Sequence, residues 1–490
     1  MNDKDKNIII EIVEKSKILN ENSKGNIIMS VKNETIKSEQ NELVDDISNE
    51  EVKNNMSEEN LNEDLMAQLK AKMAAKNASV VEEKKDMTVK IVEKKKRSID
   101  LGIVSSGQAG GRIGETFGSL GYPVVAINTA QQDLEFLNIE ESCKLHLQWT
   151  LGGTARDRSV SLDATNSNID AIRQLISDKL DSSVHGYIFA TSLAGGSGSG
   201  SAGSIISMMQ EFSKPIVVIA VLPLSNDDAI GMNNTMEALS KLTEMVQNKQ
   251  ISNLILVDNS RIETIFADVS QMDFFSVSNL AIVDGLDSFN KYSAQPSKIK
   301  SFDPQEFGTV LFSSNGLSTY GSLDITDVQE PTKIAESVIE SLSGGLLAGG
   351  FDLKQASHVG VLFVGNEETM KSIPSANINY AMSIIKETSP SASVFRGLYE
   401  DENIKPGVLR VYSIFGGLGL PVERVNSIKK LAKESLEKTK DRDQNRNLTL
   451  KLDTGVEETV SAADKVRDLI KRSGSTFSKN FTGIKDFRKK

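Results

Sequence analysis

The sequence predicts an α/β fold in which a parallel sheet covered by helices leads into a long core helix and then a smaller α+β domain. Two observations predict it. From Ile99 to about residue 260, short apolar runs such as YIFA, PIVVIAVLP and NLILVDN alternate with helical patterns. Strands that are apolar throughout are typical of parallel sheets with helices on both faces. A second block of apolar runs begins near Phe302, after a helical stretch of about twenty residues.

Bulk composition narrows the class of protein. The 490 residues exceed one typical domain, and the formal net charge of -11 argues against direct binding of nucleic acid. The single cysteine, Cys143, excludes an internal disulfide and fits a reducing compartment. We find no apolar run long enough to cross a membrane and no signal peptide, so we expect a cytoplasmic protein without a transmembrane segment. The three histidines are not grouped, so no zinc site is expected.

Changes in composition along the chain divide it into four predicted segments. Residues 1–97 contain no aromatic residue and no proline and are rich in Lys, Glu, Asn and Ser, so we predict a disordered extension. Leu65 to Lys76 has helical composition and could fold on binding a partner. Residues 98–292 form the sheet domain with its core helix, and residues 293–422 the smaller domain. Residues 423–490 form a helical and flexible tail with a basic end.

The elements are expected in a regular order. A strand, a glycine turn, a helix and a strand start at Ile99, and a buried strand lies in HGYIFA (185–190). Helices are predicted from about Gly203, over 229–247, over 274–292 and over 376–387. In the smaller domain, strands are predicted over 358–365, 391–401 and 408–417. Two helical patterns follow residue 422, the second being EETVSAADKVRDLIKRS.

Two glycine-rich turns between a strand and a helix are the candidate ligand sites. They are SSGQAGGRIG (105–114) and SLAGGSGSGSA (192–202). Glycine lets the backbone approach a phosphate, and a helix N-terminus supplies free N–H groups. Alternatives are a ligand-free turn or a nicotinamide-dependent oxidoreductase. The second strand ends in Asn128-Thr129-Ala130, without the acid that would hold a ribose, and no P-loop lysine motif occurs. Backbone amides from both turns would therefore bind phosphates.

These motifs together resemble a known family. GQAGGRIG is similar to the first loop of tubulin, VVAINTAQQDL to the second loop of FtsZ, and AGGSGSGSA to their shared glycine signature. From about Ile99 to Pro421 the chain resembles the tubulin/FtsZ GTPase superfamily, nearer FtsZ and divergent, possibly of phage or plasmid type. The resemblance implies a Rossmann-like GTPase domain that binds GTP or GDP with Mg²⁺.

The resemblance also implies a nucleotide site. LGGTARDRS (151–159) looks like the loop that senses the γ-phosphate, and Asn259 in LVDNSRI would bond the guanine or ribose. Phe275 and Asn279, at i and i+4 on one helix face, would stack on the base and bond its edge. The residues expected on phosphate are Gly107, Gln108, Ala109, Gly110, Gly111, Arg112, Gly152, Gly153, Thr154, Gly195, Gly196, Ser197, Gly198, Ser199 and Gly200.

The catalytic residues implied are Asp303 and Glu306 in SFDPQEF. They correspond to FtsZ acids that one subunit inserts into the nucleotide site of the next. An ordinary alternative is that Asp303 caps the helix that starts at Pro304. Two departures bear on hydrolysis. Ala130 stands where the second loop usually carries an acid, and Ser301 replaces an asparagine.

The implied function is a GTPase that polymerises head to tail into cytoskeletal filaments. Its partners would be further copies of itself and possibly an adaptor protein on one of its tails. Cell division, DNA or organelle positioning, and a phage role are all compatible with the resemblance. The alternative is a GTP-binding structural protein of the same fold with little or no hydrolysis, an idea that Ala130 and Ser301 motivate.

Overall fold

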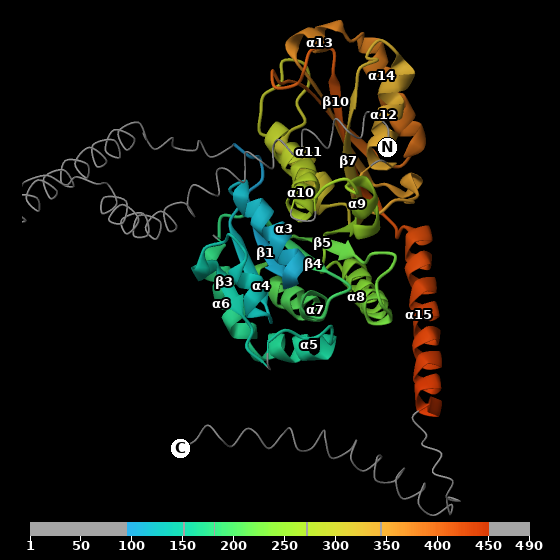
Figure 1. The fold of residues 1–490 in the computed structure, drawn as a ribbon. Helices are drawn as coiled ribbons and strands as arrows, with labels where there is room; N and C mark the ends of the chain where they lie inside the picture. Colours follow the sequence, from blue (N-terminus) through green and yellow to red (C-terminus); the bar gives the residue numbers. More distant parts are fainter. Residues whose placement is uncertain (1–95, 150–151, 181, 271–272, 344, 450–490) are drawn as a thin grey trace, which may run out of the picture. The chain divides into compact units, whose positions relative to one another are not determined.

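The computed structural model describes residues 96–149, 152–180, 182–270, 273–343 and 345–449 (Figure 1). The predicted disordered extension, apart from its last two residues, lies outside the described residues. So do the second C-terminal helical pattern and the basic end. The chain divides into two units at Lys433, and the first holds the whole sheet.

One ten-stranded sheet forms the centre of the first unit, in the order β3-β2-β1-β4-β5-β6-β7-β10-β8-β9. Pairing is parallel from β3 to β7, antiparallel on both sides of β10, and parallel between β8 and β9. The strands are β1 (Leu101–Ser106), β2 (Val124–Asn128), β3 (Lys144–His146), β4 (Gly186–Ser192), β5 (Ile216–Leu222), β6 (Asn253–Asp258), β7 (Gly316–Ile325), β8 (His358–Gly365), β9 (Ser393–Glu400) and β10 (Leu409–Leu418).

The two predicted domains share this sheet because of β7, a strand that the sequence pattern did not reveal. Its residues, GLSTYGSLDI, include glycine, serine and aspartate, which are depleted in strands. It pairs in parallel with β6 and in antiparallel with β10. The parallel half of the sheet and the smaller α+β half are therefore held in one hydrogen-bonded layer.

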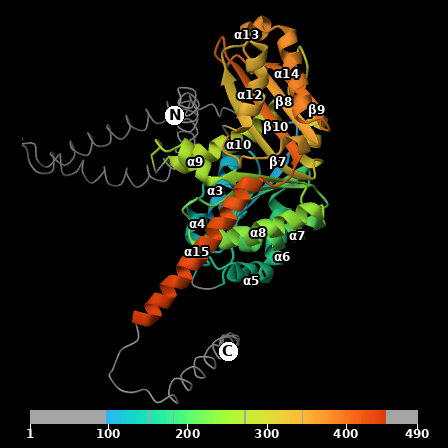
Figure 2. The same cartoon turned by 90° about the vertical axis from the view of Figure 1, so that its right-hand side faces the viewer.

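Two sets of helices cover the two faces. One core packs α3, α9, α10 and α11 on the sheet, and the other packs α5 to α8 together with α12 and α14. Helices α12 and α14 lie side by side (Figure 2). The helices are α3 (Gly107–Ser119), α4 (Gln131–Glu135), α5 (Arg158–Ser167), α6 (Ile169–Lys179), α7 (Ser197–Met209), α8 (Ala229–Gln247), α9 (Asn259–Ile265), α10 (Phe274–Tyr292), α11 (Pro304–Phe312), α12 (Pro331–Ser343), α13 (Glu367–Ser372), α14 (Ser375–Thr388) and α15 (Val422–Thr449).

Most of the predicted elements occur where expected. Helices α8 and α10 and strand β8 have the predicted bounds, and α14 differs by one residue at each end. The helix after the glycine signature was predicted too late, since α7 begins at Ser197 and not near Gly203. The signature Gly198-Ser199-Gly200 lies inside the first turns of α7, where close packing requires small side chains. A Cβ on Gly200 would lie 2.5 Å from the carbonyl oxygen of Arg158.

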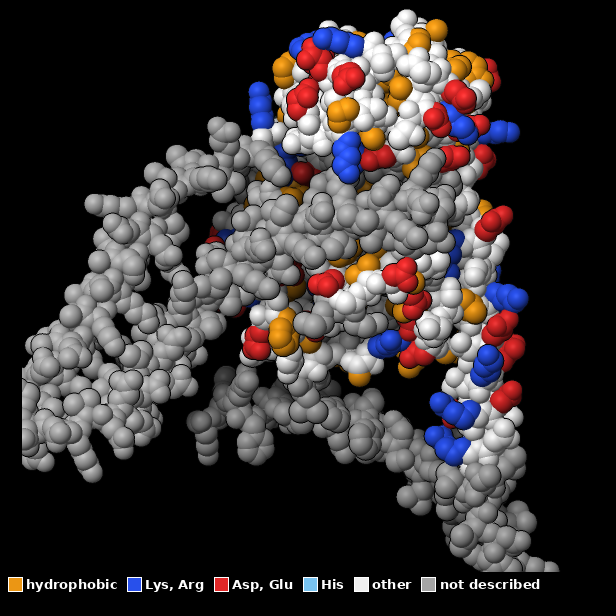
Figure 3. All heavy atoms as spheres, turned by 45° about the horizontal axis from the view of Figure 1, so that its top comes forward, with side chains coloured by type: hydrophobic (Ala, Val, Ile, Leu, Met, Phe, Trp, Pro, Cys, Tyr) orange, Lys and Arg blue, Asp and Glu red, His pale blue; other side chains and the backbone are white. Residues whose placement is uncertain are grey.

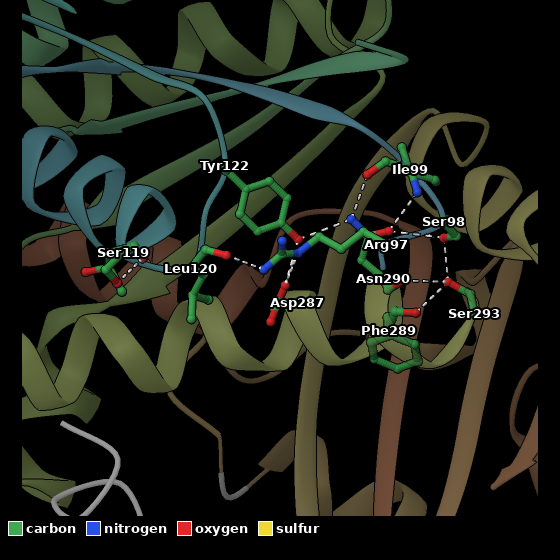
Figure 4. Close-up of polar contacts among 11 residues, drawn as sticks. Arg97, Ser98, Ile99, Ser119, Leu120, Tyr122, Asp287, Phe289, Asn290 and Ser293 are labelled. Carbon is green, nitrogen blue, oxygen red and sulfur yellow. Dashed lines mark hydrogen bonds and ion pairs between the residues drawn. The ribbon is translucent and has the colours of Figure 1, made fainter. Parts of the chain in front are cut away.

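A buried polar cluster fixes the start of the described chain to the core helix (Figure 4). The Arg97 guanidinium donates to Asp287 Oδ1 at 2.6 Å and to the Leu120 carbonyl at 2.6 Å, and it lies 4.1 Å from the centre of the Tyr122 ring. Tyr122 donates its hydroxyl proton to the same Asp287 oxygen at 2.8 Å. The side-chain amide of Asn290 accepts the Ile99 N–H and donates to the Ile99 carbonyl. Burial and the Asp287 charge raise the pKa of Tyr122, which keeps it a donor.

The surface carries mixed charge. Figure 3 shows Lys and Arg side chains interspersed with Asp and Glu over the described face that it presents. None of the helices in the described part of the chain has the length and hydropathy of a membrane span.

Candidate nucleotide site

The two glycine turns meet at the carboxyl edge of the parallel strands. α3 begins at Gly107 directly after β1, and α7 begins at Ser197 shortly after β4, which is the neighbour of β1 in the sheet. Gly107 has a φ of +75°, and a Cβ at this position would lie 2.8 Å from the Gly198 nitrogen. Only glycine combines that conformation with that contact.

Further close contacts bring the two helix N-termini together. A Cβ on Gly110 would lie 2.3 Å from the Ala190 carbonyl oxygen, so α3 packs directly on β4. The Ser106 and Ser201 hydroxyls are 2.7 Å apart. Two adjacent helix N-termini present unpaired amides and partial positive charge, which is the arrangement that binds phosphate groups. The residues predicted on phosphate in both turns are therefore brought together, and their role stays a prediction.

The predicted γ-phosphate loop packs against the glycine signature. Gly153 donates its N–H to the Thr129 carbonyl at 2.9 Å, and a Cβ on Gly196 would lie 2.1 Å from Thr154 Oγ1. The loop backbone is left-handed at Gly152 and Gly153 and also at Ala155 and Arg156, where φ is 46° and 67°. Non-glycine residues in this region store strain, and such strain is common at functional loops.

Asn234 on α8 holds this loop and was not predicted. Its side-chain amide is buried and donates to the carbonyl of Arg156 at 2.9 Å and to that of Ala194 at 3.2 Å. One residue thus joins the γ-phosphate loop to the glycine signature. Its sequence neighbourhood, GMNNT, carries no signal for this contact.

Arg156 is tied to two acids beyond β5. Its guanidinium donates to Asp227 at 2.7 Å and to Asp228 at 2.6 Å. The hydrogen bond to Asp227 is the main cause that raises the pKa of Arg156. The positive charge of this residue is therefore compensated within the protein.

The predicted base-binding pair lies at the start of α10. Phe275 is 48% exposed and Asn279 is 9% exposed, one turn apart on the same helix. The Arg112 guanidinium lies over the Phe275 ring, 4.1 Å from its centre. Arg112 was predicted on phosphate, and this contact also joins it to the residue predicted to stack on the base.

Asn259 follows the end of β6 and opens α9. The preceding residue, Asp258, caps that helix through the Ser260 N–H and forms a two-pronged ion pair with Arg424 at 2.7 and 2.8 Å. This ion pair, 12% and 4% exposed, ties the start of α15 to the end of β6. Asn259 is thus held on a rigid strand end.

The short helix α4, which follows β2, contains an acid that the sequence analysis did not predict, Asp133. Ala130 stands at the N-cap of α4 and offers no side-chain hydrogen bond. One turn later, Asp133 accepts a hydrogen bond from Gln108 Nε2 at 3.1 Å and another from Asn128 Nδ2 at 3.1 Å. Asp133 belongs to the motif VVAINTAQQDL, but it stands three residues after the position where the second loop usually carries an acid.

The predicted catalytic acids form a capping box at the start of α11. Asp303 accepts the Glu306 N–H at 2.8 Å, and Glu306 accepts the Asp303 N–H at 3.1 Å. Burial raises the pKa of Glu306. The capping alternative therefore describes the local structure. The second oxygen of Glu306, Oε1, lies 3.9 Å from Lys300 Nζ, while Asp303 Oδ2 can still accept from a second partner.

These acids lie at the other end of the sheet from the phosphate loops. A Cβ on Gly308 of α11 would lie 3.7 Å from Ile99, just before β1, and Phe312 contacts Gly186, the first residue of β4. Both contacts mark the amino ends of strands whose carboxyl ends carry the loops. A six-residue strand spans about 20 Å. The structure therefore does not bring Asp303 and Glu306 into the site of their own chain.

Comparison with known proteins gives two family matches. Residues 100–267 match the tubulin/FtsZ family GTPase domain, and residues 300–422 match the C-terminal domain of the tubulin-like protein TubZ. Among curated proteins, the chain is 25% identical to tubulin-like protein CetZ of Pyrococcus abyssi, over 62% of this chain and 81% of CetZ. It is 24% identical to TubZ of Bacillus thuringiensis subsp. israelensis, over 70% of this chain and 78% of TubZ.

A solved structure has the same fold. It is the GTPγS-form protofilament of TubZ from Bacillus thuringiensis serovar israelensis, with a TM-score of 0.64 and 22% identity. The match covers 72% of this chain and 96% of the TubZ chain.

Proposed function

Because the chain belongs to the tubulin/FtsZ family of GTPases, we propose that it binds GTP at the carboxyl edge of its sheet and assembles head to tail into filaments, in which each subunit completes the hydrolytic site of its neighbour. The observation that carries the proposal is the separation of Asp303 and Glu306 from the phosphate loops of the same chain. Acids at one end and phosphate loops at the other can meet only across a contact between two copies. A head-to-tail contact of this kind is heterologous, and it yields an open filament when its rotation does not close into a ring.

The TubZ relative supports the filament part of the proposal, since its crystal structure is that of a protofilament in the GTPγS form. In our proposal, amides of α3 and α7 hold the phosphates, Phe275 and Asn279 hold the base, and Asn259 holds the ribose or base. Asp303 and Glu306 from the next subunit orient the attacking water. Positioning and charge stabilisation account for most of the catalysis of phosphoryl transfer.

Mg²⁺ would neutralise charge that develops on the phosphates. Among the described residues, no group of three or more His, Cys, Asp or Glu side chains could hold a metal ion. This fits an ion that takes most of its ligands from phosphate oxygens and water and only one or two carboxylates from the protein.

A second candidate function is a filament or interaction protein that binds GTP with little turnover. The capping box favours it, because both acids already have structural partners in the chain. In that case nucleotide binding and assembly would persist, and phosphate release would be negligible for the native chain too.

Substitution of Asp303 tests the proposal. Asp303→Asn keeps a good N-cap but removes the carboxylate, whereas Asp303→Ala removes both. We expect the native chain to pellet with GTP and Mg²⁺ above a threshold concentration and to release phosphate in proportion to the pellet. Asp303→Asn should pellet equally while phosphate release falls at least about 100-fold, as for loss of a general base.

Glu244→Gln on α8 serves as the control, since Glu244 is exposed and pairs with the exposed Lys241 on the same helix. It should behave like the native chain. Full phosphate release by Asp303→Asn would contradict the catalytic role. Negligible release by the native chain, with intact GTP binding and pelleting, would favour the second candidate.

A further inference from the structure

The carboxylate of Asp133 lies where three candidate phosphate loops converge. Through Gln108 it contacts the first glycine turn, and through Asn128 it contacts the end of β2, both at 3.1 Å. The next residue of that strand end, Thr129, shares a 2.6 Å hydrogen bond with Ser197 of the glycine signature. The Thr129 carbonyl accepts the Gly153 N–H of the γ-phosphate loop.

Among the residues that the structure describes, Asp133 has hydrogen-bond donors but no ion-pair partner. Both of its donors are side-chain amides, which carry no charge. A negative carboxylate beside loops that bind a polyphosphate makes binding of the polyphosphate less favourable, since like charges a few ångströms apart repel strongly at a protein surface. A divalent cation between the carboxylate and the phosphates turns this repulsion into attraction.

Asp133 is also the first acid that follows Ala130 in the sequence. Ala130, at the usual position of the acid in this family, has no ligating atom, and Gln131 and Gln132 are neutral. Asp133 stands three residues after Ala130, which is about one helical turn, so α4 presents it on the side of Ala130. Mg²⁺ sites on nucleotides commonly use one or two carboxylates, directly or through bound water.

We propose that Asp133 is the carboxylate that positions the nucleotide-bound Mg²⁺, in place of the acid missing at Ala130. The inference rests on the proposed GTP site and specifies which residue of this chain faces the ion. Asn128, buried at 2% exposure, would orient the carboxylate from beneath, and Gln108 would link it to the first glycine turn.

The test measures binding of GTPγS by calorimetry, once with Mg²⁺ and once with EDTA, together with Mn²⁺ binding by electron paramagnetic resonance in the presence of GTPγS. The variant is Asp133→Asn, which keeps an acceptor for Gln108 or Asn128 and removes the charge. We expect its Mn²⁺ affinity to fall about 10- to 100-fold, the usual cost of disturbing the surroundings of a metal. Its GTPγS affinity should fall with Mg²⁺ but not with EDTA, where loss of a repelling charge leaves it equal or tighter.

Two further variants make the result specific. Glu135→Gln changes the charge of the same short helix by the same amount. Within the described part of the chain, the Glu135 carboxylate bonds only the exposed Gln131, so this variant should match the native chain. Ala130→Asp combined with Asp133→Asn returns a carboxylate to the usual family position and should restore Mn²⁺ binding. Thermal unfolding by circular dichroism confirms that each variant is folded.

Several results would overturn the proposal. If Asp133→Asn weakens GTPγS equally with Mg²⁺ and with EDTA, Asp133 only orients Gln108 or stabilises the start of α4. If it keeps the full Mg²⁺ dependence, another group faces the ion. If the native chain binds GTPγS under neither condition, the nucleotide site itself fails. The inference then falls with it, an outcome distinct from the other two.

Discussion

Phe275 illustrates how single residues combine at the site. Its ring is half exposed, its edge packs against Phe274 at a centroid distance of 5.3 Å, and Arg112 lies over one face. Arg112 comes from α3, the helix whose first turn forms the phosphate loop, whereas Phe275 comes from α10. In the proposed site, the contact therefore couples the phosphate end to the base end. Cation–π contacts of this kind contribute about 0.5–2 kcal/mol.

Removal of the ring should weaken nucleotide binding. Stacking of a base on an aromatic side chain contributes about 1–3 kcal/mol, so Phe275→Ala should raise the Kd for GTPγS roughly 5- to 150-fold. Phe275→Trp keeps a stacking surface and should bind nearly as the native chain does. The measurement is calorimetric titration of both variants. An unchanged Kd for Phe275→Ala would show that the base lies elsewhere.

At the residue scale, sequence reasoning found the glycines and missed the polar anchors. Gly107, Gly196 and Gly198 are recognisable because close backbone contact at a phosphate loop requires glycine at fixed spacing. Asn234 and Asp133 act through contacts that only folding creates, across 78 residues to Arg156 and 25 residues to Gln108. No local pattern encodes such distances.

At the scale of elements, the cluster around Arg97 joins three segments. Arg97 binds Leu120, the residue after α3, and Asp287 on α10, while Asn290 on the same helix holds Ile99. The end of the phosphate-loop helix is therefore fixed to the core helix that carries Phe275 and Asn279. The Arg97 and Asp287 side chains are only 7% and 8% exposed, so the pair is shielded from water.

Breaking this pair should destabilise the fold. Arg97→Ala leaves the Asp287 carboxylate buried with only the Tyr122 hydroxyl as a partner, and loss of one member of a buried pair costs about 3–5 kcal/mol. Urea unfolding followed by circular dichroism measures the change. Arg173→Ala is the control, because Arg173 pairs with exposed acids, and it should unfold like the native chain. A loss for Arg97→Ala no larger than for Arg173→Ala would mean that the cluster contributes little.

Strong periodicity explains which elements could be predicted. α8 is long and amphipathic, α10 is long and buried on nearly all sides, and β8 is apolar throughout, so their bounds follow from the sequence. β7 is polar in composition and is a strand because β6 and β10 flank it. The start of α7 was predicted too late because its first turns consist mostly of glycine and serine, which have low helix propensity.

At the scale of the whole molecule, the continuous sheet determines where the two parts of the catalytic machinery lie. The predicted phosphate loops lie at the carboxyl ends of β1, β2 and β4, whereas Gly308 and Phe312 of α11 contact the amino ends of β1 and β4. Because β6, β7 and β10 form one layer, the acids are held at a fixed place relative to the loops. In the proposed mechanism, hydrolysis by this chain requires a second copy, and the rate of turnover therefore reports assembly.

Mixing two inactive variants tests this central claim most directly. One is Asp303→Asn, which keeps its nucleotide site. The other is Phe275→Ala combined with Asn279→Ala, which keeps its acids. The GTP concentration is chosen so that GTP fills the nucleotide site of Asp303→Asn but not that of the double variant. Phosphate release and pelleted protein are measured for each variant alone and for the mixture at equal total concentration. If subunits share sites, the mixture releases phosphate well above the sum of its parts, because intact sites of one variant meet intact acids of the other. If both proteins pellet together and release no more phosphate than they do separately, the acids do not act across the contact, and the account is wrong.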